Sequence, residues 1–145
     1  SEYDGVVVAA AGLLRLGLET KISEFLPIQK FTPEAGQGTL VIQIRSDDPE
    51  LLNLVEGLSH KATNVAFRAE RAFSVALGSG CTVPVAAYAK VKGQKLHIEG
   101  MMALSNENCI VRGEFIGEYD KPESSGQALA NQLTRSYNSE IEKGD

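Results

Sequence analysis

The stretch VAAYAKVKGQKLHIEGMMAL (residues 85–104) holds two runs suited to strands around a short glycine turn. We predict strands over residues 85–91 and 95–104, because the turn Lys92-Gly93-Gln94 is short enough for an antiparallel hairpin. A third strand is predicted over residues 109–116, after a second polar turn at residues 105–108. Together the three runs predict a meander.

Two amphipathic helices are predicted on either side of this meander. The first spans residues 62–77 and ends at Gly78, and its apolar residues recur at every fourth position: Val65, Ala69, Phe73 and Leu77. The second opens on Ser124-x-x-Gln127, which has the form of a capping box, and its stripe is Leu129, Leu133, Tyr137 and Ile141. The order helix, three strands, helix predicts an α/β (α+β) fold with a three-stranded antiparallel sheet covered by helices.

The beginning of the chain has a different character. The run DGVVVAAAG (residues 4–12) is continuously apolar and bounded by glycines, which is typical of a strand buried on both faces of a parallel sheet. Parallel neighbours require long connections, and these would lie upstream. The chain also lacks an initiator Met. We therefore expect a fragment of a longer protein.

The segment between these regions is predicted to contain a domain boundary. A short helix is expected around residues 23–26, and a Gly36-Gln37-Gly38 turn leads into a strand that reaches Arg45. Asp48 can cap a helix with Pro49 at its first position, and the buried face of that helix would be Leu51, Val55 and Leu58. We place the boundary here, with a partial region over 1–46 and a C-terminal domain over 47–145.

Composition limits the function classes. The chain has 145 residues, a formal net charge of −5 and no basic cluster, so nucleic acid is not expected as a partner. No apolar run approaches the roughly 20 residues that a membrane helix needs, and we expect a cytoplasmic protein with no membrane partner. Two cysteines make no disulfide framework, and the distant His60 and His97 predict no metal site.

Several residues could carry chemistry. GSGCTVP (residues 78–84) presents Cys81 on a shaped turn, where the thiol is either reactive or an inert structural residue. Arg15 could bind a carboxylate or could simply lie at the surface. The amides of the turn at 36–38 could bind carboxylate or phosphate oxygens, or could only introduce a strand. Cys109 is expected in the core.

The helix over 62–77 also has a charged side. Its residues Arg68, Glu70 and Arg71 are expected to form a solvated face of ion pairs.

Three ordered segments resemble one family when they are taken together. They are DGVVVAAAGLLRLGL (4–18), EAGQGTLVIQIRSDD (34–48) and FRAERAFSVALGSGCTVPVAAYA (67–89), and they resemble porphobilinogen deaminase, also called hydroxymethylbilane synthase. The family chain is roughly twice as long, so the resemblance is to its C-terminal half. One departure is Ser79-Gly80, where the family usually has two glycines before the cysteine.

The resemblance implies a transferase of tetrapyrrole (heme and porphyrin) biosynthesis. Such an enzyme joins four porphobilinogen units into hydroxymethylbilane with release of ammonia, on a dipyrromethane cofactor held as a thioether. Cys81 matches the attachment cysteine, and Gln37 and Gly38 match turn positions near the cofactor. Arg15 matches an arginine that pairs with substrate carboxylates, and Ala9 matches a lining position.

The resemblance also implies what this chain lacks. The family's catalytic acidic residue lies upstream, so no catalytic residue is expected here and the fragment alone should be inactive. Residues 1–46 would complete two domains that resemble periplasmic binding proteins, with the missing N-terminal half as their partner.

Two other function classes remain open. One is a non-catalytic ligand-binding or regulatory α+β module in which Cys81 is only a turn residue. The other is an interaction domain with no chemistry.

Overall fold

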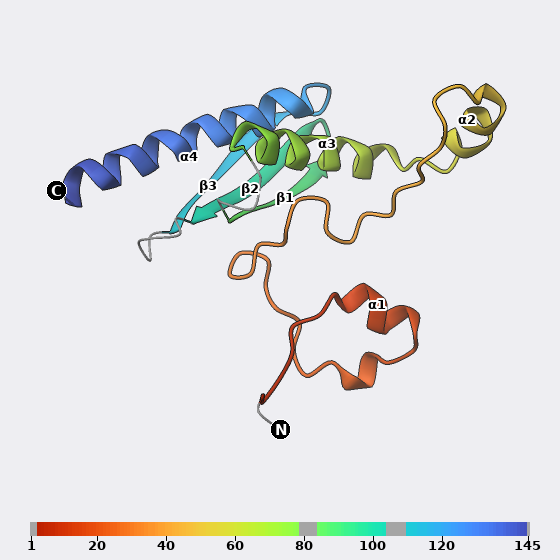
Figure 1. Cartoon of the computed structure of the whole chain (residues 1–145), viewed down its shortest axis with the longest axis horizontal. Helices are drawn as coiled ribbons and strands as arrows, with labels where there is room; N and C mark the ends of the chain where they lie inside the picture. The colour runs from red at the N-terminus through yellow and green to blue at the C-terminus, as the bar shows by residue number, and fades with distance from the viewer. Residues whose placement is uncertain (1–2, 79–83, 104–109, 145) are drawn as a thin grey trace.

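The computed structural model describes residues 3–78, 84–103 and 110–144, with side-chain burial described as far as residue 139. Its C-terminal part is built on a three-stranded antiparallel sheet in the order β1-β2-β3 (Figure 1). The strands are β1 (Val85–Lys92), β2 (Lys95–Ala103) and β3 (Ile110–Glu118). The predicted meander is therefore confirmed.

The register of the sheet follows from the first hairpin. Lys92 pairs with Lys95 around the turn, where Gly93 has a φ of 62°, a backbone conformation that glycine adopts without strain. Burial then alternates along β2, so that one face is enclosed and the other is more open.

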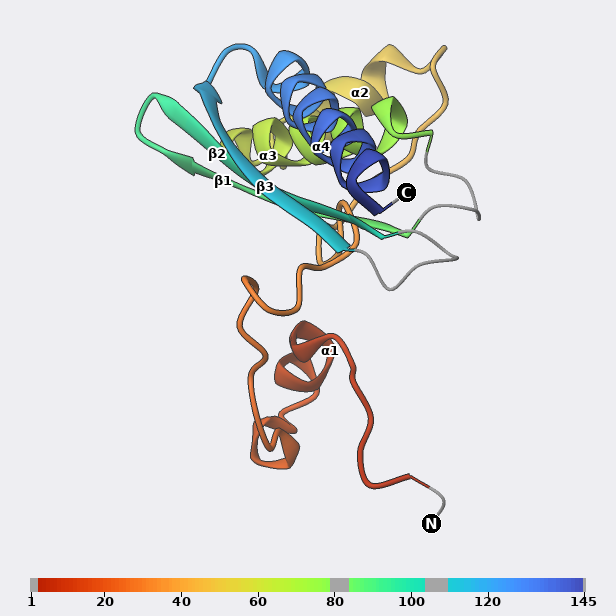
Figure 2. The ribbon, with the colours of Figure 1, turned by 90° about the vertical axis from the view of Figure 1, so that its left-hand side faces the viewer.

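Two helices cover the enclosed face of the sheet. They are α3 (Lys61–Ala76), which packs on β1, and α4 (Pro122–Gly144), which packs on β3 and against α3 (Figures 1 and 2). The buried apolar residues come from both helices and from β1 and β2: Val65, Ala69, Phe73, Ala87, Ala89, Leu96, Ile98, Met102, Leu129, Ala130 and Leu133. The predicted layer, covered on one face, is confirmed.

Close contact between the layers depends on small residues. A Cβ at Gly126 of α4 would collide with the backbone carbonyl of Ala69 and would lie 2.8 Å from the Phe73 nitrogen. A Cβ at Gly113 of β3 would lie 2.8 Å from the side chain of Leu133. These glycines let α4 approach both α3 and the sheet.

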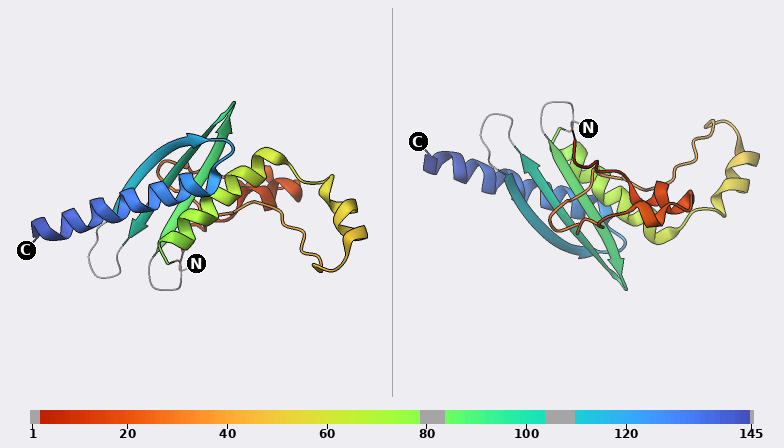
Figure 3. Two further views of the ribbon diagram at one scale, coloured as in Figure 1. Left: turned by 90° about the horizontal axis from the view of Figure 1, so that it is seen from above. Right: turned by 90° about the horizontal axis from the view of Figure 1, so that it is seen from below.

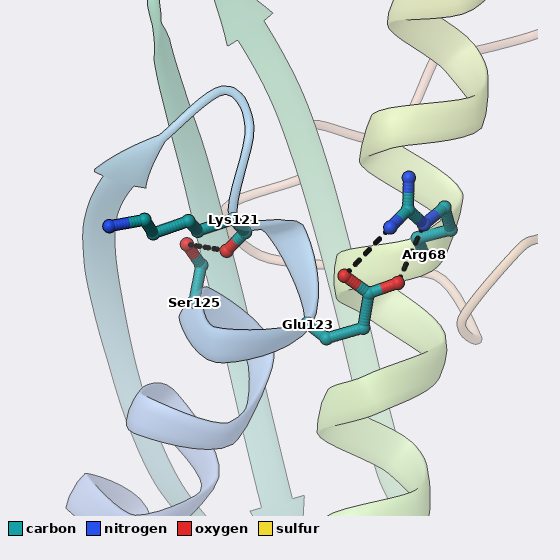
Figure 4. Close-up of polar contacts among 4 residues, drawn as sticks. All are labelled: Arg68, Lys121, Glu123 and Ser125. Atoms are coloured by element: carbon teal, nitrogen blue, oxygen red, sulfur yellow. Dashed lines mark hydrogen bonds and ion pairs between the residues drawn. The ribbon is translucent and has the colours of Figure 1, made fainter.

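The start of α4 differs from the predicted capping box. The helix begins at Pro122, so Ser124 lies inside the first turn and is not the cap. The backbone N–H of Ser125 instead donates to the Lys121 carbonyl at 3.2 Å, and the Ser125 hydroxyl donates to the same oxygen at 3.1 Å (Figure 4). Proline is favoured at the first helical position, because its missing N–H would have no helical partner there.

Residues 3–32 lie on the side of the sheet opposite α3 and α4 (Figures 2 and 3). The strands predicted over residues 4–12 and 39–45 are wrong for this structure, which has no strand in either range and a short helix α1 (Ala10–Arg15) that begins within the first. Val6 is 83% exposed and Leu40 is 74% exposed. A strand requires a partner for its backbone groups, and none of the described residues supplies one.

Two smaller predictions for the residues before the sheet are also wrong, one in full and one in part. The helix expected around residues 23–26 is absent, and a short 3-10 helix, η1 (Glu19–Lys21), lies just before it. The helix α2 (Pro49–Glu56) is confirmed, with Asp48 Oδ1 accepting the Leu51 N–H at 3.0 Å. Its predicted buried face is confirmed only in part: Leu51 and Val55 are half-buried, whereas Leu58 is 70% exposed, and α2 contacts none of the other described helices and strands.

None of the described helices has the length and hydropathy that a membrane span requires.

Candidate functional site

Among the residues whose burial is described, Glu70 on α3 is the buried charged residue. It is only 7% exposed, and its carboxylate accepts two backbone hydrogen bonds. Oε2 accepts the Gly36 N–H at 2.8 Å and Oε1 accepts the Ala89 N–H at 2.7 Å. The predicted solvated face is therefore wrong for Glu70.

The two charged neighbours of Glu70 on the helix are exposed, as expected, but the ion pair found there is made with α4. Arg71 is exposed, and Arg68 forms an exposed ion pair with Glu123. Glu70 lies three residues before Phe73 of the buried stripe, but this spacing alone does not indicate that its carboxylate is enclosed.

The surroundings of Glu70 act on its pKa in opposite directions. Burial raises the pKa of this carboxyl above the ordinary value of 4.5, and this effect is the largest. The hydrogen bonds from Ala89 and Gly36 stabilise the ionised form and lower the pKa, but they only partly offset the burial.

The turn at residues 36–38 is tight, as predicted. Gly36 and Gly38 have φ values of 79° and 83°, in the left-handed region that favours glycine. The Gln37 N–H donates to the Glu34 carbonyl at 3.0 Å, and the Gly36 N–H is held by Glu70. Two of the amides that could have bound a ligand oxygen are therefore engaged within the protein.

A groove of about 380 Å³ opens beside this turn. Gln37 and Gly38 form part of one wall, and the first half of α3 and the second half of β1 form the remainder, with Lys90 and Glu70 among the lining residues. The structure thus brings two of the predicted site residues to a concave surface that is shared with α3 and β1.

The segment leading to this turn is fixed to the open face of the sheet. Arg112 of β3 donates from Nη1 to the Thr32 hydroxyl at 3.1 Å and to the Gln29 carbonyl at 3.4 Å, and from Nη2 to the Lys30 carbonyl at 3.3 Å. These hydrogen bonds join residues about 80 positions apart in the sequence. The spacing of apolar residues along the chain therefore could not predict them.

Two further predicted residues lie apart from the groove. Arg15 is the last residue of α1 and is exposed, and Ala9 precedes that helix with its carbonyl accepting the Gly12 N–H at 3.1 Å. Among the described elements α1 contacts only η1 (Figure 1). The structure therefore does not bring Arg15 and Ala9 to Gln37 and Gly38.

The predicted attachment residue Cys81, like Cys109, lies outside the described residues. The residues flanking its segment are described. Helix α3 ends at Ala76, with Leu77 as its C-cap and Gly78 next at a φ of 67°, and the Pro84 carbonyl accepts the Ala103 N–H at 2.9 Å. Along the helix axis, Ala76 lies roughly 14 Å from Phe67, which lines the groove, at 1.5 Å per residue.

The described residues contain no group of three or more His, Cys, Asp or Glu side chains that could hold a metal ion.

Two family models match consecutive parts of the chain. The model described as "Porphobilinogen deaminase, dipyromethane cofactor binding domain" matches residues 1–53. The model described as "Porphobilinogen deaminase, C-terminal domain" matches residues 65–135.

Curated relatives that carry the name porphobilinogen deaminase agree with both matches. The protein of Carboxydothermus hydrogenoformans is 41% identical over 132 residues, which is 91% of this chain and 42% of the relative. That of Alkaliphilus metalliredigens is 43% identical over 141 residues, or 97% of this chain and 42% of the relative. The chain thus spans about 42% of the length of these relatives. It belongs to the porphobilinogen deaminase family.

Proposed function

We propose that this chain is the part of a porphobilinogen deaminase that carries the dipyrromethane cofactor. The complete enzyme would be a transferase that joins four porphobilinogen units into hydroxymethylbilane and releases ammonia. The observation that carries the proposal is the succession of the two family matches along the chain, with GSGC of residues 78–81 between α3 and β1.

Cys81 is the proposed attachment residue. A thiol is the soft nucleophile that a thioether bond to a pyrrole methylene requires, and the bound dipyrrole supplies the primer on which further units are added. The described flanks of the Cys81 segment are α3, which ends at Ala76, and β1, which begins at Val85. A free thiol is also best preserved in a reducing compartment such as the cytoplasm.

The other proposed contacts lie before the C-terminal domain. Gln37 and Gly38 would face the cofactor from the groove wall. Arg15 would pair with substrate carboxylates through its planar fork of donors, and Ala9 would line the substrate side. The catalytic acidic group would come from the remainder of the enzyme.

We further propose that residues 1–46 complete the other domains of the enzyme and that 47–145 form the cofactor-attachment domain. Support comes from Val6 and Val7, 83% and 76% exposed, and from Leu40 and Val41, 74% and 70% exposed. Apolar residues at this density suit strands whose partners come from elsewhere. The chain alone would therefore lack turnover.

The test is intact-mass measurement on the full-length protein after acid denaturation. The unaltered protein should carry a covalent dipyrrole, Cys81→Ala should carry none, and Cys109→Ala should carry it in full. An adduct on the Cys81→Ala protein would overturn the assignment of this residue. An unmodified thiol in the unaltered protein would favour a non-catalytic binding module instead.

A further inference from the structure

Strand β1 is one of the two edges of the sheet, and two of its outward N–H groups have partners from outside the sheet. An edge strand exposes N–H groups that another strand could pair with. Here the Ala87 N–H donates to the Pro33 carbonyl at 3.0 Å, and the Ala89 N–H donates to Glu70 Oε1 at 2.7 Å. A side-chain carboxylate from α3 thus takes the place of a neighbouring strand.

The second oxygen of the same carboxylate connects the edge to the glycine turn. Oε2 of Glu70 accepts the Gly36 N–H at 2.8 Å, so one side chain bridges α3, β1 and the turn. The turn also lies directly against the helix, because a Cβ at Gly36 would come within 2.7 Å of the Phe67 ring. Both the hydrogen bond and the close approach fix the turn relative to α3.

We propose that Glu70 is a positioning residue that fixes the 36–38 turn on the cofactor-attachment domain and thereby sets where Gln37 and Gly38 face the oligopyrrole. The part that concerns the oligopyrrole rests on the proposed function, whereas the contact itself does not. A carboxylate suits this position because both of its oxygens accept hydrogen bonds. Glutamine has the same shape but only one acceptor oxygen, so it must leave one of the two N–H groups without a partner.

The first experiment tests the contact in the 145-residue chain by amide hydrogen exchange. In Glu70→Gln, exchange at Gly36 or Ala89 should accelerate roughly ten- to a hundred-fold, as expected for the loss of a charge-assisted hydrogen bond. Exchange at Ile98 in the central strand should stay unchanged. Glu56→Gln, an exposed change of the same chemistry on α2, is the matched control and should alter neither amide.

The second experiment tests positioning in the full-length enzyme. Glu70→Gln should leave the covalent adduct intact but lower kcat/KM by at least ten-fold per loaded molecule. Gly36→Ala should produce the same defect with Glu70 still present, because its Cβ would displace the turn from Phe67. If both changes act through the turn, the double variant should be little worse than either single variant.

The outcomes separate the contact, the positioning role and the proposed function. Unchanged exchange at both Gly36 and Ala89 in Glu70→Gln would overturn the contact. Accelerated exchange with unchanged kcat/KM, or a loss of thermal stability alone, would reduce Glu70 to a structural residue. If the unaltered full-length protein carried no dipyrrole, the proposed function and the positioning role would both fall, and the exchange result would still decide the contact.

Discussion

Arg68 on α3 and Glu123 in the first turn of α4 form a two-pronged ion pair between the helices. Nε of Arg68 lies 2.6 Å from Glu123 Oε1, and Nη2 lies 2.9 Å from Oε2 (Figure 4). The hydrogen bond from Arg68 is the main reason that the pKa of Glu123 lies below its usual range. The two paired residues lie 55 positions apart in the sequence, and their ion pair joins the two helices.

The energetic value of this pair should nevertheless be small. Both side chains are about half exposed, at 48% and 55%, and solvated ion pairs contribute about 0.2–1 kcal/mol. A double-mutant cycle of Arg68→Gln and Glu123→Gln, measured by urea unfolding, should give a coupling energy in this range. High salt should reduce it, because exposed charges are screened.

The sign of its pH dependence follows from the lowered pKa of Glu123. A depressed folded-state pKa contributes stability that is present above the unfolded value near 4.5 and is lost as the pH falls through the folded value. The coupling energy should therefore disappear in acid. A coupling that grows below pH 4.5 would contradict this account.

A second prediction concerns the contact between α3 and α4 at Gly126. Gly126→Ala should destabilise the domain by about 1–3 kcal/mol, because the added methyl collides with the rigid backbone of α3 at Ala69. This cost exceeds the roughly 0.5–1 kcal/mol that alanine gains over glycine within a helix. Thermal unfolding measures the difference.

The control for this change is Gly57→Ala at the end of α2. Gly57 has a φ of −63° and no heavy atom within 4 Å of a built Cβ, so its replacement should change stability by less than about 0.5 kcal/mol. Equal effects at Gly57 and Gly126 would argue against the close approach of the helices.

The C-terminal layer could be predicted from sequence because its signals are local. The turn between Lys92 and Lys95 predicts the first hairpin, and the stripe of Val65, Ala69 and Phe73 predicts the buried face of α3. Each signal lies within a short stretch of sequence. The strands expected near Val6 and Leu40 failed for the opposite reason. An apolar run indicates a strand only if another chain segment pairs with it, and the described residues supply no such segment.

The candidate site shows the same division between local and distant causes. The tight Gly36–Gly38 turn could be predicted, since glycine permits the positive φ values found there. The burial of Glu70 could not, because it depends on Gly36, which lies 34 residues away in sequence. The attachment role of Cys81 stays a prediction from the resemblance, since this residue lies outside the described part of the chain.

A third prediction concerns the pH dependence that Glu70 imposes. Its pKa is raised by burial, so the folded state binds this proton more tightly than the unfolded state. Stability should then fall as the pH rises from about 4.5 through the folded pKa of Glu70, opposite to the effect of Glu123. The free energy of unfolding of the unaltered chain, minus that of Glu70→Gln, should decline over this interval. A difference that rises there would show that the two backbone hydrogen bonds outweigh burial.

The last prediction addresses Arg15 in the full-length enzyme. If Arg15 binds a substrate carboxylate through two hydrogen bonds, its contribution is on the order of 1.5–3 kcal/mol. Arg15→Leu should then reduce kcat/KM for porphobilinogen by roughly ten- to a hundred-fold, while Arg15→Lys should recover only part of the loss because it cannot reproduce the planar fork. Lys21→Ala, an exposed cation on the neighbouring η1, is the matched control and should keep full activity. Full activity in Arg15→Leu would make Arg15 a surface residue, whereas equal losses at Arg15 and Lys21 would indicate a general effect of positive charge rather than a specific clamp.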